Sequence, residues 1–151
     1  RSSATHDSDG DLHVVLKPDQ GQLSGTIEGK TVVNAFNFGP ALVVNGEIRK
    51  KGYSNGMAAD KGSQRMALCQ TGPLSYKVIC CASPFRGSTG MTLDKFAAFV
   101  ASRHDVINAY NMDGGDSTML IFGGKKINDV DNPNTRQIAD LIYFASAWDG
   151  E

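Results

Sequence analysis

Short apolar runs separated by glycine-rich polar turns make up most of this chain, a pattern typical of a protein built mainly from strands. In residues 74–82, the apolar side chains recur at a spacing of two and so share one face. Asn45-Gly46, between two β-branched runs, is typical of a two-residue type I′ hairpin. The pattern predicts strands at residues 11–17, 31–38, 41–44, 64–70, 74–82, 105–112, 118–122, 125–128 and 138–145.

One segment has the helical period instead. Its apolar side chains recur at i, i+3, i+4 and i+7, as Leu93, Phe96, Ala97 and Val100. Thr92 stands where a helix cap is expected, and we expect the helix to end near Arg103. The strands and this helix together predict an α+β domain, with a mixed, largely antiparallel sheet packed on one long helix.

The chain of 151 residues is long enough for one domain with its own core. Residues 1–10 are polar, so we expect a flexible N-terminal end followed by a single domain over residues 11–151. Fifteen basic and sixteen acidic residues give a formal net charge of −1, which offers no electrostatic case for a nucleic-acid partner. No apolar run approaches the roughly 18 residues that a membrane span needs.

The sequence gives little sign of a metal or cofactor, and we expect neither. The acidic stretches 7–11 and 129–132 lack the glutamate that completes a calcium loop, so both are interpreted as solvated loops. The cysteines have no zinc-site spacing with the histidines. The chain has three cysteines, Cys69, Cys80 and Cys81. An odd number cannot pair completely within one chain, but one intramolecular disulfide remains an alternative.

The polar turn at residues 111–118 is the strongest candidate for chemistry, because it lies between two apolar segments and contains adjacent glycines. Strand alternation predicts that Asn111 and Asp113 point into the same space. Consecutive turn amides, here those of residues 114–116, often form an anion-receiving concavity. Hydroxyl and backbone donors of the turn are then candidates for substrate binding: Gly114, Gly115, Ser117 and Thr118. The alternative is a hairpin turn whose polar side chains stabilise their own backbone.

Two arginines are further candidates, because a guanidinium binds phosphate or carboxylate in a fork-like geometry. Arg65 stands at the start of an apolar strand, and Arg136 stands just before the last predicted strand. The alternative for each is a solvated arginine or one paired with a surface acid.

Several segments in combination resemble the phosphodiester glycosidase family: Gly90-Met91-Thr92-Leu93, residues 108–118, Gly124-Lys125, Asn128, Asn132-Pro133, Arg136 and Ala139-Asp140. Residues 38–46 and Arg65 resemble further parts of its pattern. The resemblance covers about Asn34 to Phe144. This chain has Asp116 where the family pattern has a third glycine, and no Asn-Gly-Gly-Phe-like motif precedes Asn34. We therefore expect the domain to lack the N-terminal portion of the family.

The resemblance implies a hydrolase that cleaves the glycosidic C1–O bond of a sugar-1-phosphodiester, with a sugar of the N-acetylglucosamine type. Asp113 would be the nucleophile or the base, Arg65 and Arg136 would bind the departing phosphate, and Asn111 would orient the sugar or Asp113. The other class of function left open is a non-catalytic glycan- or phosphate-binding module of a cell-envelope or exopolysaccharide protein, and a third is a structural domain that retains the fold alone.

The resemblance also implies an extracytoplasmic protein, whether secreted, periplasmic or in the cell envelope. Its expected partner is a sugar-phosphate or glycan substrate. A sheet without its first strands would expose an edge, so we expect a homo-oligomer or a companion N-terminal segment to cover it.

Overall fold

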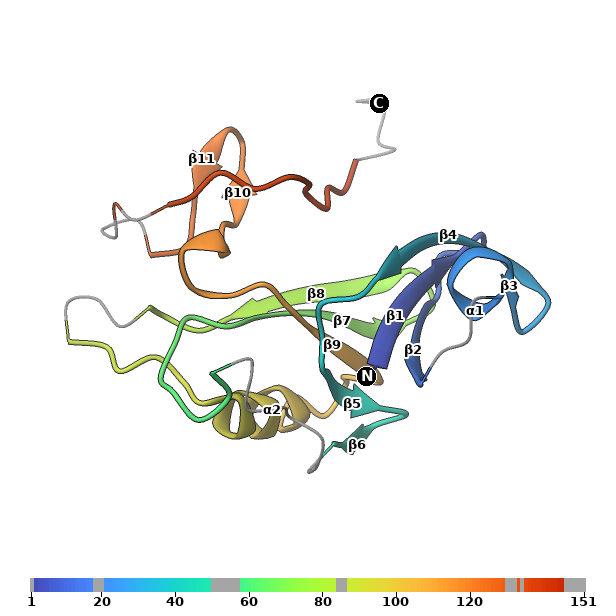
Figure 1. Cartoon of the computed structure of the whole chain (residues 1–151), viewed down its shortest axis with the longest axis horizontal. Helices are drawn as coiled ribbons and strands as arrows, with labels where there is room; N and C mark the ends of the chain where they lie inside the picture. The colour runs from blue at the N-terminus through green and yellow to red at the C-terminus, as the bar shows by residue number, and fades with distance from the viewer. Residues whose placement is uncertain are drawn as a thin grey trace.

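The computed structural model describes residues 2–17, 21–49, 58–83, 87–129, 133 and 135–145. Two antiparallel sheets make up its body (Figure 1). The first sheet has five strands in the order β6 (Glu47–Ile48), β5 (Ala41–Val44), β9 (Asn108–Met112), β7 (Met66–Gly72) and β8 (Ser75–Cys80). The second has four, in the order β2 (Leu12–Leu16), β1 (Ser2–Asp7), β4 (Lys30–Phe36) and β3 (Thr26–Ile27).

Strand β9 lies in the middle of the five-stranded sheet and contributes to both of its faces. Ala109 belongs to the cluster that packs under helix α2 (Leu93–Ala101), together with Cys69 of β7 and Phe96 of the helix. Tyr110, the next residue, points to the opposite face and packs with Ala4 and other residues of the four-stranded sheet. The five-stranded sheet is therefore the middle layer, and β9 brings the polar turn that follows it out of the most buried part of the fold.

Helix α2 begins as the sequence predicts. Thr92 caps it by accepting a hydrogen bond from Lys95 N at 3.4 Å, and the predicted apolar stripe is buried. It ends at Ala101 with Ser102 as its cap, close to the expected Arg103, and the N–H groups of Ser102 and Arg103 bind Ala98 O and Val100 O. The other helical pieces among the described residues are short: α1 (Gly21–Ser24) and the 3₁₀ turn η2 (Gly115–Ser117).

The predicted fold class is wrong. The structure is 40% strand and 12% helical, and α2, with nine residues, is the only described helix of seven residues or more. The five-stranded sheet is not packed on one long helix, since α2 covers one of its faces and the second sheet covers the other. The prediction missed this second sheet largely because it treated the first ten residues as a flexible end.

Residues 2–7 form strand β1, which pairs with β2 on one side and β4 on the other. Ala4 is fully buried against the five-stranded sheet. The alternate side chains Ser3, Thr5 and Asp7 are also buried, so the strand is polar on a covered face. The polar composition of residues 1–10 favoured a flexible end because serine, threonine and aspartate side chains are seldom buried, and that expectation is wrong for residues 2–7.

The C-terminal part of the chain has less regular structure than predicted. The hairpin of β10 (Ile121–Phe122) and β11 (Lys125–Lys126) is two residues long in each strand, around Gly123-Gly124 with positive φ at both glycines. The strand predicted at residues 138–145 is absent, and its large apolar side chains are exposed: Ile138, Leu141, Ile142, Tyr143 and Phe144. Among the described residues, no helix is long and apolar enough to cross a membrane.

Candidate active site

The turn at residues 111–118 leaves the end of β9 and enters η2 (Figure 1). One close contact and one positive φ explain its glycines. A Cβ on Gly114 would lie 2.5 Å from Gln64 O, and Gly115 has a φ of +58°. Other side chains would clash at the first position and be strained at the second. The sequence Gly114-Gly115 thus allows the turn to lie directly on the backbone that precedes β7.

Asn111 is the innermost polar residue of the turn, with 1% of its surface exposed. Its Nδ2 donates to Gly39 O at 2.8 Å, and its backbone N–H donates to Pro40 O at 2.9 Å. Its Oδ1 is buried and has no hydrogen-bond partner in the described part of the chain. An unpaired buried acceptor is costly, and such atoms in native proteins call for an explanation such as a ligand.

Asp113 lies at the exposed tip of the turn. Its Oδ1 accepts the N–H of Gly114 at 2.9 Å, which fixes one carboxylate oxygen. Strand β9 ends at Met112, so the regular alternation that predicted a common direction for Asn111 and Asp113 stops before Asp113. The structure instead combines a buried amide with a solvent-facing carboxylate two residues later.

The expected concavity of turn amides is partly occupied by the protein itself. The N–H of Gly114 binds the carboxylate of Asp113, and the N–H of Gly115 binds Gln64 O at 2.9 Å. Ser117 is different, because its Oγ is buried without a hydrogen-bond partner among the described residues. Thr118 is 2% exposed and donates from Oγ1 to Asp113 O at 3.4 Å. The backbone N–H groups of Gly114 and Gly115 are therefore already used, and the unpaired polar atoms of the turn belong to side chains.

Arg65 reaches the turn with its backbone, since its Cα is 3.9 Å from the Cβ position of Gly114. Its buried guanidinium binds carbonyl groups elsewhere: Nε donates to Met91 O at 3.2 Å, and Nη2 donates to Ala58 O and Lys61 O at 2.8 and 3.0 Å. Burial lowers the pKa of Arg65 from its usual value, against an opposite effect of Cys81. Arg65 thus fixes the backbone on which the turn rests.

Arg136 also meets the turn through its backbone, where its N–H donates to Asp116 O at 3.3 Å. The residue is exposed. The structure therefore brings both predicted arginines to the turn, one beneath it with its guanidinium on carbonyl groups and one at the surface.

Three residues that hold the turn were given no role by the sequence: Gln64, Asn128 and Asp129. Gln64 is 2% exposed and accepts the Gly115 N–H. Asn128 was part of the family resemblance, and its side chain clamps Thr118 O and Leu120 N at 3.0 and 2.6 Å. Asp129, expected in a solvated loop, accepts from Gln64 Nε2 at 2.8 Å. Of the three, only Asn128 was marked by the sequence, through the family resemblance and without a role.

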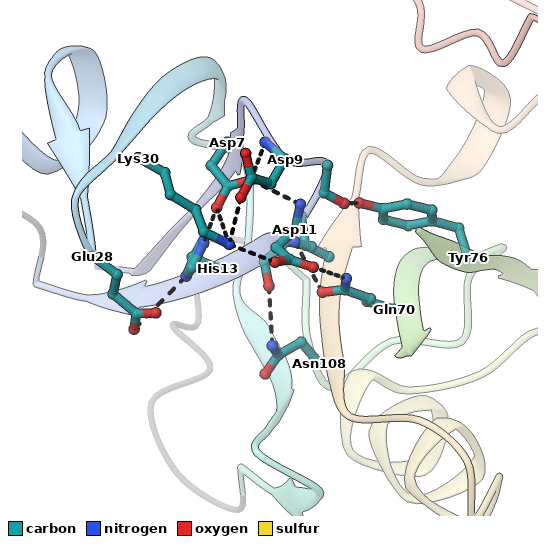
Figure 2. A network of polar contacts seen from close by, with 11 residues as sticks. Asp7, Asp9, Asp11, His13, Glu28, Lys30, Gln70, Tyr76 and Asn108 are labelled. Atoms are coloured by element: carbon teal, nitrogen blue, oxygen red, sulfur yellow. Dashed lines mark hydrogen bonds and ion pairs between the residues drawn. The ribbon is translucent and has the colours of Figure 1, made fainter. Parts of the chain in front are cut away.

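A second polar cluster lies at the β1–β2 turn (Figure 2). Here Lys30 Nζ lies 3.7, 3.2 and 3.0 Å from carboxylate oxygens of Asp7, Asp9 and Asp11. Asp7 is 1% exposed, so the expectation of a solvated loop is wrong for this residue. Among the described residues, no group of three or more His, Cys, Asp or Glu side chains is placed to hold a metal ion. The lysine supplies the positive charge that these acids share.

The three cysteines are free thiols: Cys69, Cys80 and Cys81. Burial raises the pKa of the Cys69 thiol to about 12, so it stays protonated and unreactive at neutral pH. Cys81 Sγ accepts the backbone N–H of Arg65 at 3.2 Å. The bridge that the sequence left open is not formed in this structure.

With this geometry in view, comparison with known proteins shows the class of the chain. A family model described as phosphodiester glycosidase matches residues 1–145. The chain belongs to this family of glycosidase-type hydrolases, and the resemblance seen in the sequence is confirmed. A comparison with curated proteins finds no match.

Solved structures share the fold. One is the zebrafish N-acetylglucosamine-1-phosphodiester alpha-N-acetylglucosaminidase catalytic domain auto-inhibited by its pro-peptide, with a TM-score of 0.61 and 18% identity, matched over 85% of this chain and 44% of that one. Another is a hypothetical protein from Synechocystis, with a TM-score of 0.51 and 20% identity, over 84% of this chain and 30% of that one. The chain therefore spans less than half the length of either neighbour.

Proposed function

We propose that this domain hydrolyses the glycosidic C1–O bond of a sugar-1-phosphodiester, with a sugar of the N-acetylglucosamine type. One observation carries the proposal. Two buried polar atoms, Asn111 Oδ1 and Ser117 Oγ, have no hydrogen-bond partner among the described residues, and they flank the exposed Asp113 in the sequence. Unpaired polar atoms in the same turn as a solvent-facing acid suit a site for a polyhydroxylated ligand, which can supply their missing hydrogen bonds.

The reaction divides between these residues according to their position. Water adds across the C1–O bond, which yields a free sugar and a phosphate monoester. Asp113, as the exposed carboxylate, acts as the nucleophile or as the base that activates water, and the Gly114 N–H orients it. Asn111, Ser117 and Thr118 bind the sugar, with Asn111 Oδ1 accepting one of its hydroxyl groups.

Stabilisation of the departing phosphate falls to the arginines. Arg136 is exposed and its backbone N–H is bound to Asp116 O of the turn, which supports a role for its guanidinium in binding phosphate directly. Arg65 contributes less directly: its Cα lies under Gly114, while its buried guanidinium stays bound to Met91 O and Ala58 O and supports the backbone of the site. A phosphate monoester is a weakly basic leaving group, so one carboxylate suffices where most glycosidases use two.

The same reasoning extends to location. Family resemblance favours an extracytoplasmic protein that acts on sugar phosphates or glycans outside the cytoplasm. The substrate, rather than a nucleic acid, is the expected partner, since the formal net charge is −1.

A second candidate function is binding of a glycan or phosphate without turnover. It is favoured by the internal use of the Gly114 and Gly115 amides, which leaves fewer donors for a developing negative charge. The two functions separate in one assay. An N-acetylglucosamine α-1-phosphodiester is incubated with the chain, and free sugar and phosphate monoester are measured over time. Their appearance in equal amounts supports hydrolysis, whereas saturable binding with no product supports the binding module.

A further inference from the structure

The turn at residues 111–118 is held in its middle and at its end by residues outside it. In its middle, Gln64 O accepts the Gly115 N–H at 2.9 Å and lies against Gly114. At its end, the Asn128 side chain donates to Thr118 O at 3.0 Å and accepts from Leu120 N at 2.6 Å. Within the turn, Thr118 N donates to Gly115 O at 3.0 Å. Any movement of the two holding residues relative to one another would therefore deform the turn.

One hydrogen bond joins these two holding points. Gln64 Nε2 donates to Asp129 Oδ2 at 2.8 Å, and Asp129 follows Asn128 directly in the chain. The same oxygen of Asp129 also accepts Ser83 N at 2.5 Å, which fixes the carboxylate from a second side. The contacts thus form a closed ring through Gly115, Gln64, Asp129, Asn128 and Thr118.

Asp129 has a φ of +38°, a conformation that residues with a side chain rarely adopt. Its carboxylate is bound in this conformation by Gln64 Nε2 and Ser83 N. Gln64 is almost fully buried, so its amide has little water to replace the carboxylate if the pair is broken. The side chains of both residues are therefore engaged with other parts of the protein.

We propose that Gln64 and Asp129 are a positioning pair, whose hydrogen bond closes this ring and sets where the Asp113 carboxylate stands. Gly114 connects the pair to Asp113. It lies against Gln64 O, and its N–H donates the hydrogen bond that orients the Asp113 carboxylate. The inference rests on the proposed function, since the pair acts on the reaction through Asp113. A small displacement of a reacting group is enough to slow an enzyme strongly.

The test uses Gln64→Met, which keeps the length and the backbone carbonyl of residue 64 but removes the Nε2 donor. We expect the exchange rate of the Gly115 amide hydrogen to rise about 10-fold, and kcat to fall about 10- to 100-fold with KM changed less than about threefold. Asp129→Asn keeps an acceptor oxygen and tolerates positive φ, so it should stay near wild type in both measurements.

Gln70→Met is the matched control, because Gln70, within β7, is also a buried glutamine but binds Leu12 N and Asp11 Oδ1 instead. It should leave Gly115 exchange unchanged once the rates are corrected for global stability. If Gln64→Met does not fold, Asp129→Gly removes the acceptor and suits the positive φ, and the same two changes are expected from it.

Unchanged Gly115 exchange in the folded variant overturns the ring. Faster exchange with an unchanged kcat overturns the positioning role. If the wild-type chain shows no turnover, the proposed function fails, while Gly115 exchange still decides whether the pair holds the turn.

Discussion

The two polar clusters of this domain differ in how completely their atoms are paired. At the β1–β2 turn, Asp7 accepts the N–H groups of Asp9 and Asp11, both at 2.9 Å, and His13 Nε2 lies 2.8 Å from its other oxygen. At the turn after β9, Asn111 Oδ1 and Ser117 Oγ are buried without partners among the described residues. The carboxylate of Asp7 is thus fully paired, although Thr5 Oγ1 of the same strand is buried without a partner among the described residues, and the two unpaired atoms of the second cluster fit the proposed ligand site.

This difference separates a stabilising network from a site. The first cluster joins both sheets, because Gln70 of β7 accepts from Leu12 N and donates to Asp11 Oδ1, both at 2.9 Å. Tyr76 of β8 adds a hydrogen bond to Gly10 O (Figure 2). The cluster in which Lys30 meets three carboxylates is therefore interpreted as structural, while the proposed chemistry belongs to the turn with fewer charges and two unpaired atoms. Charge density alone would have selected the wrong region.

The largest effect is expected at Asp113. Asp113→Asn keeps the shape but removes the negative charge, so kcat should fall about 10²- to 10⁴-fold, the range typical of a lost acid–base group. The free energy of unfolding should change by less than about 0.5 kcal/mol, since the residue is exposed. Initial rates and urea unfolding measure the two quantities. Asp116→Asn, at an exposed acid of the same turn, is the control and should keep most activity; equal losses in both variants would argue against a specific role for Asp113.

Asp7→Ala should give the opposite pattern. It leaves the N–H groups of Asp9 and Asp11 without their acceptor and Lys30 without one of its partners. We expect a loss of about 3 kcal/mol in the free energy of unfolding, measured in urea, with kcat unchanged while the protein is folded. A stable but inactive Asp7→Ala protein would mean that the two clusters had been assigned the wrong roles.

Gln70→Met tests the junction between the sheets. The buried Leu12 N–H loses its acceptor, which should cost about 1–3 kcal/mol of unfolding free energy. Thermal unfolding followed by circular dichroism gives the shift. A variant as stable as the wild type would show that the contact adds nothing to the docking of the sheets.

Arg136→Ala should act on binding of the phosphate. KM for the phosphodiester is expected to rise about 10-fold, and raising the salt concentration should reduce the difference, because an exposed guanidinium is screened. Steady-state kinetics at two ionic strengths test this. Lys125→Ala, at another exposed cation, provides the comparison, and a similar rise there would indicate a general charge effect.

A further effect is a pH dependence of stability that comes from the first cluster. Burial raises the pKa of Asp7, but hydrogen bonds from Asp11 N, His13 and Asp9 N, with the charge of Lys30, outweigh it and lower the pKa from 3.8 to about 2. The stabilisation is therefore complete above pH 3.8 and is lost as the pH falls towards about 2. Urea unfolding across this range should show the loss in wild type and a weaker dependence in Asp7→Ala. Equal slopes would remove Asp7 as its source.

Local patterns predicted the elements that depend on local contacts. The helix cap at Thr92 and the hairpin at Asn45-Gly46, where both residues have positive φ, are confirmed. The strand at residues 2–7 was missed because its burial depends on two other strands. It pairs with β2, which follows after a turn, and with β4, which lies more than 20 residues further along the chain. The strand predicted at residues 138–145 failed for the converse reason, since an apolar pattern without a neighbouring strand gives no sheet.

The same limit applies to the site. Glycines and polar residues in one run identified the turn, because tight backbone geometry leaves a sequence signal. Nothing local shows that Arg65 turns its guanidinium to Met91 O and Ala58 O, or that Gln64 meets Asp129 across 65 positions of sequence. Partners of this kind are set by the packing of whole segments.

Hydrolysis of an N-acetylglucosamine α-1-phosphodiester in water labelled with oxygen-18 tests the central claim most directly. Cleavage of the C1–O bond places the label on the sugar and leaves the phosphate monoester unlabelled, which is the predicted result. Label in the phosphate, or binding of the substrate with no release of sugar by the folded chain, would contradict the assignment of this turn as a glycosidase site.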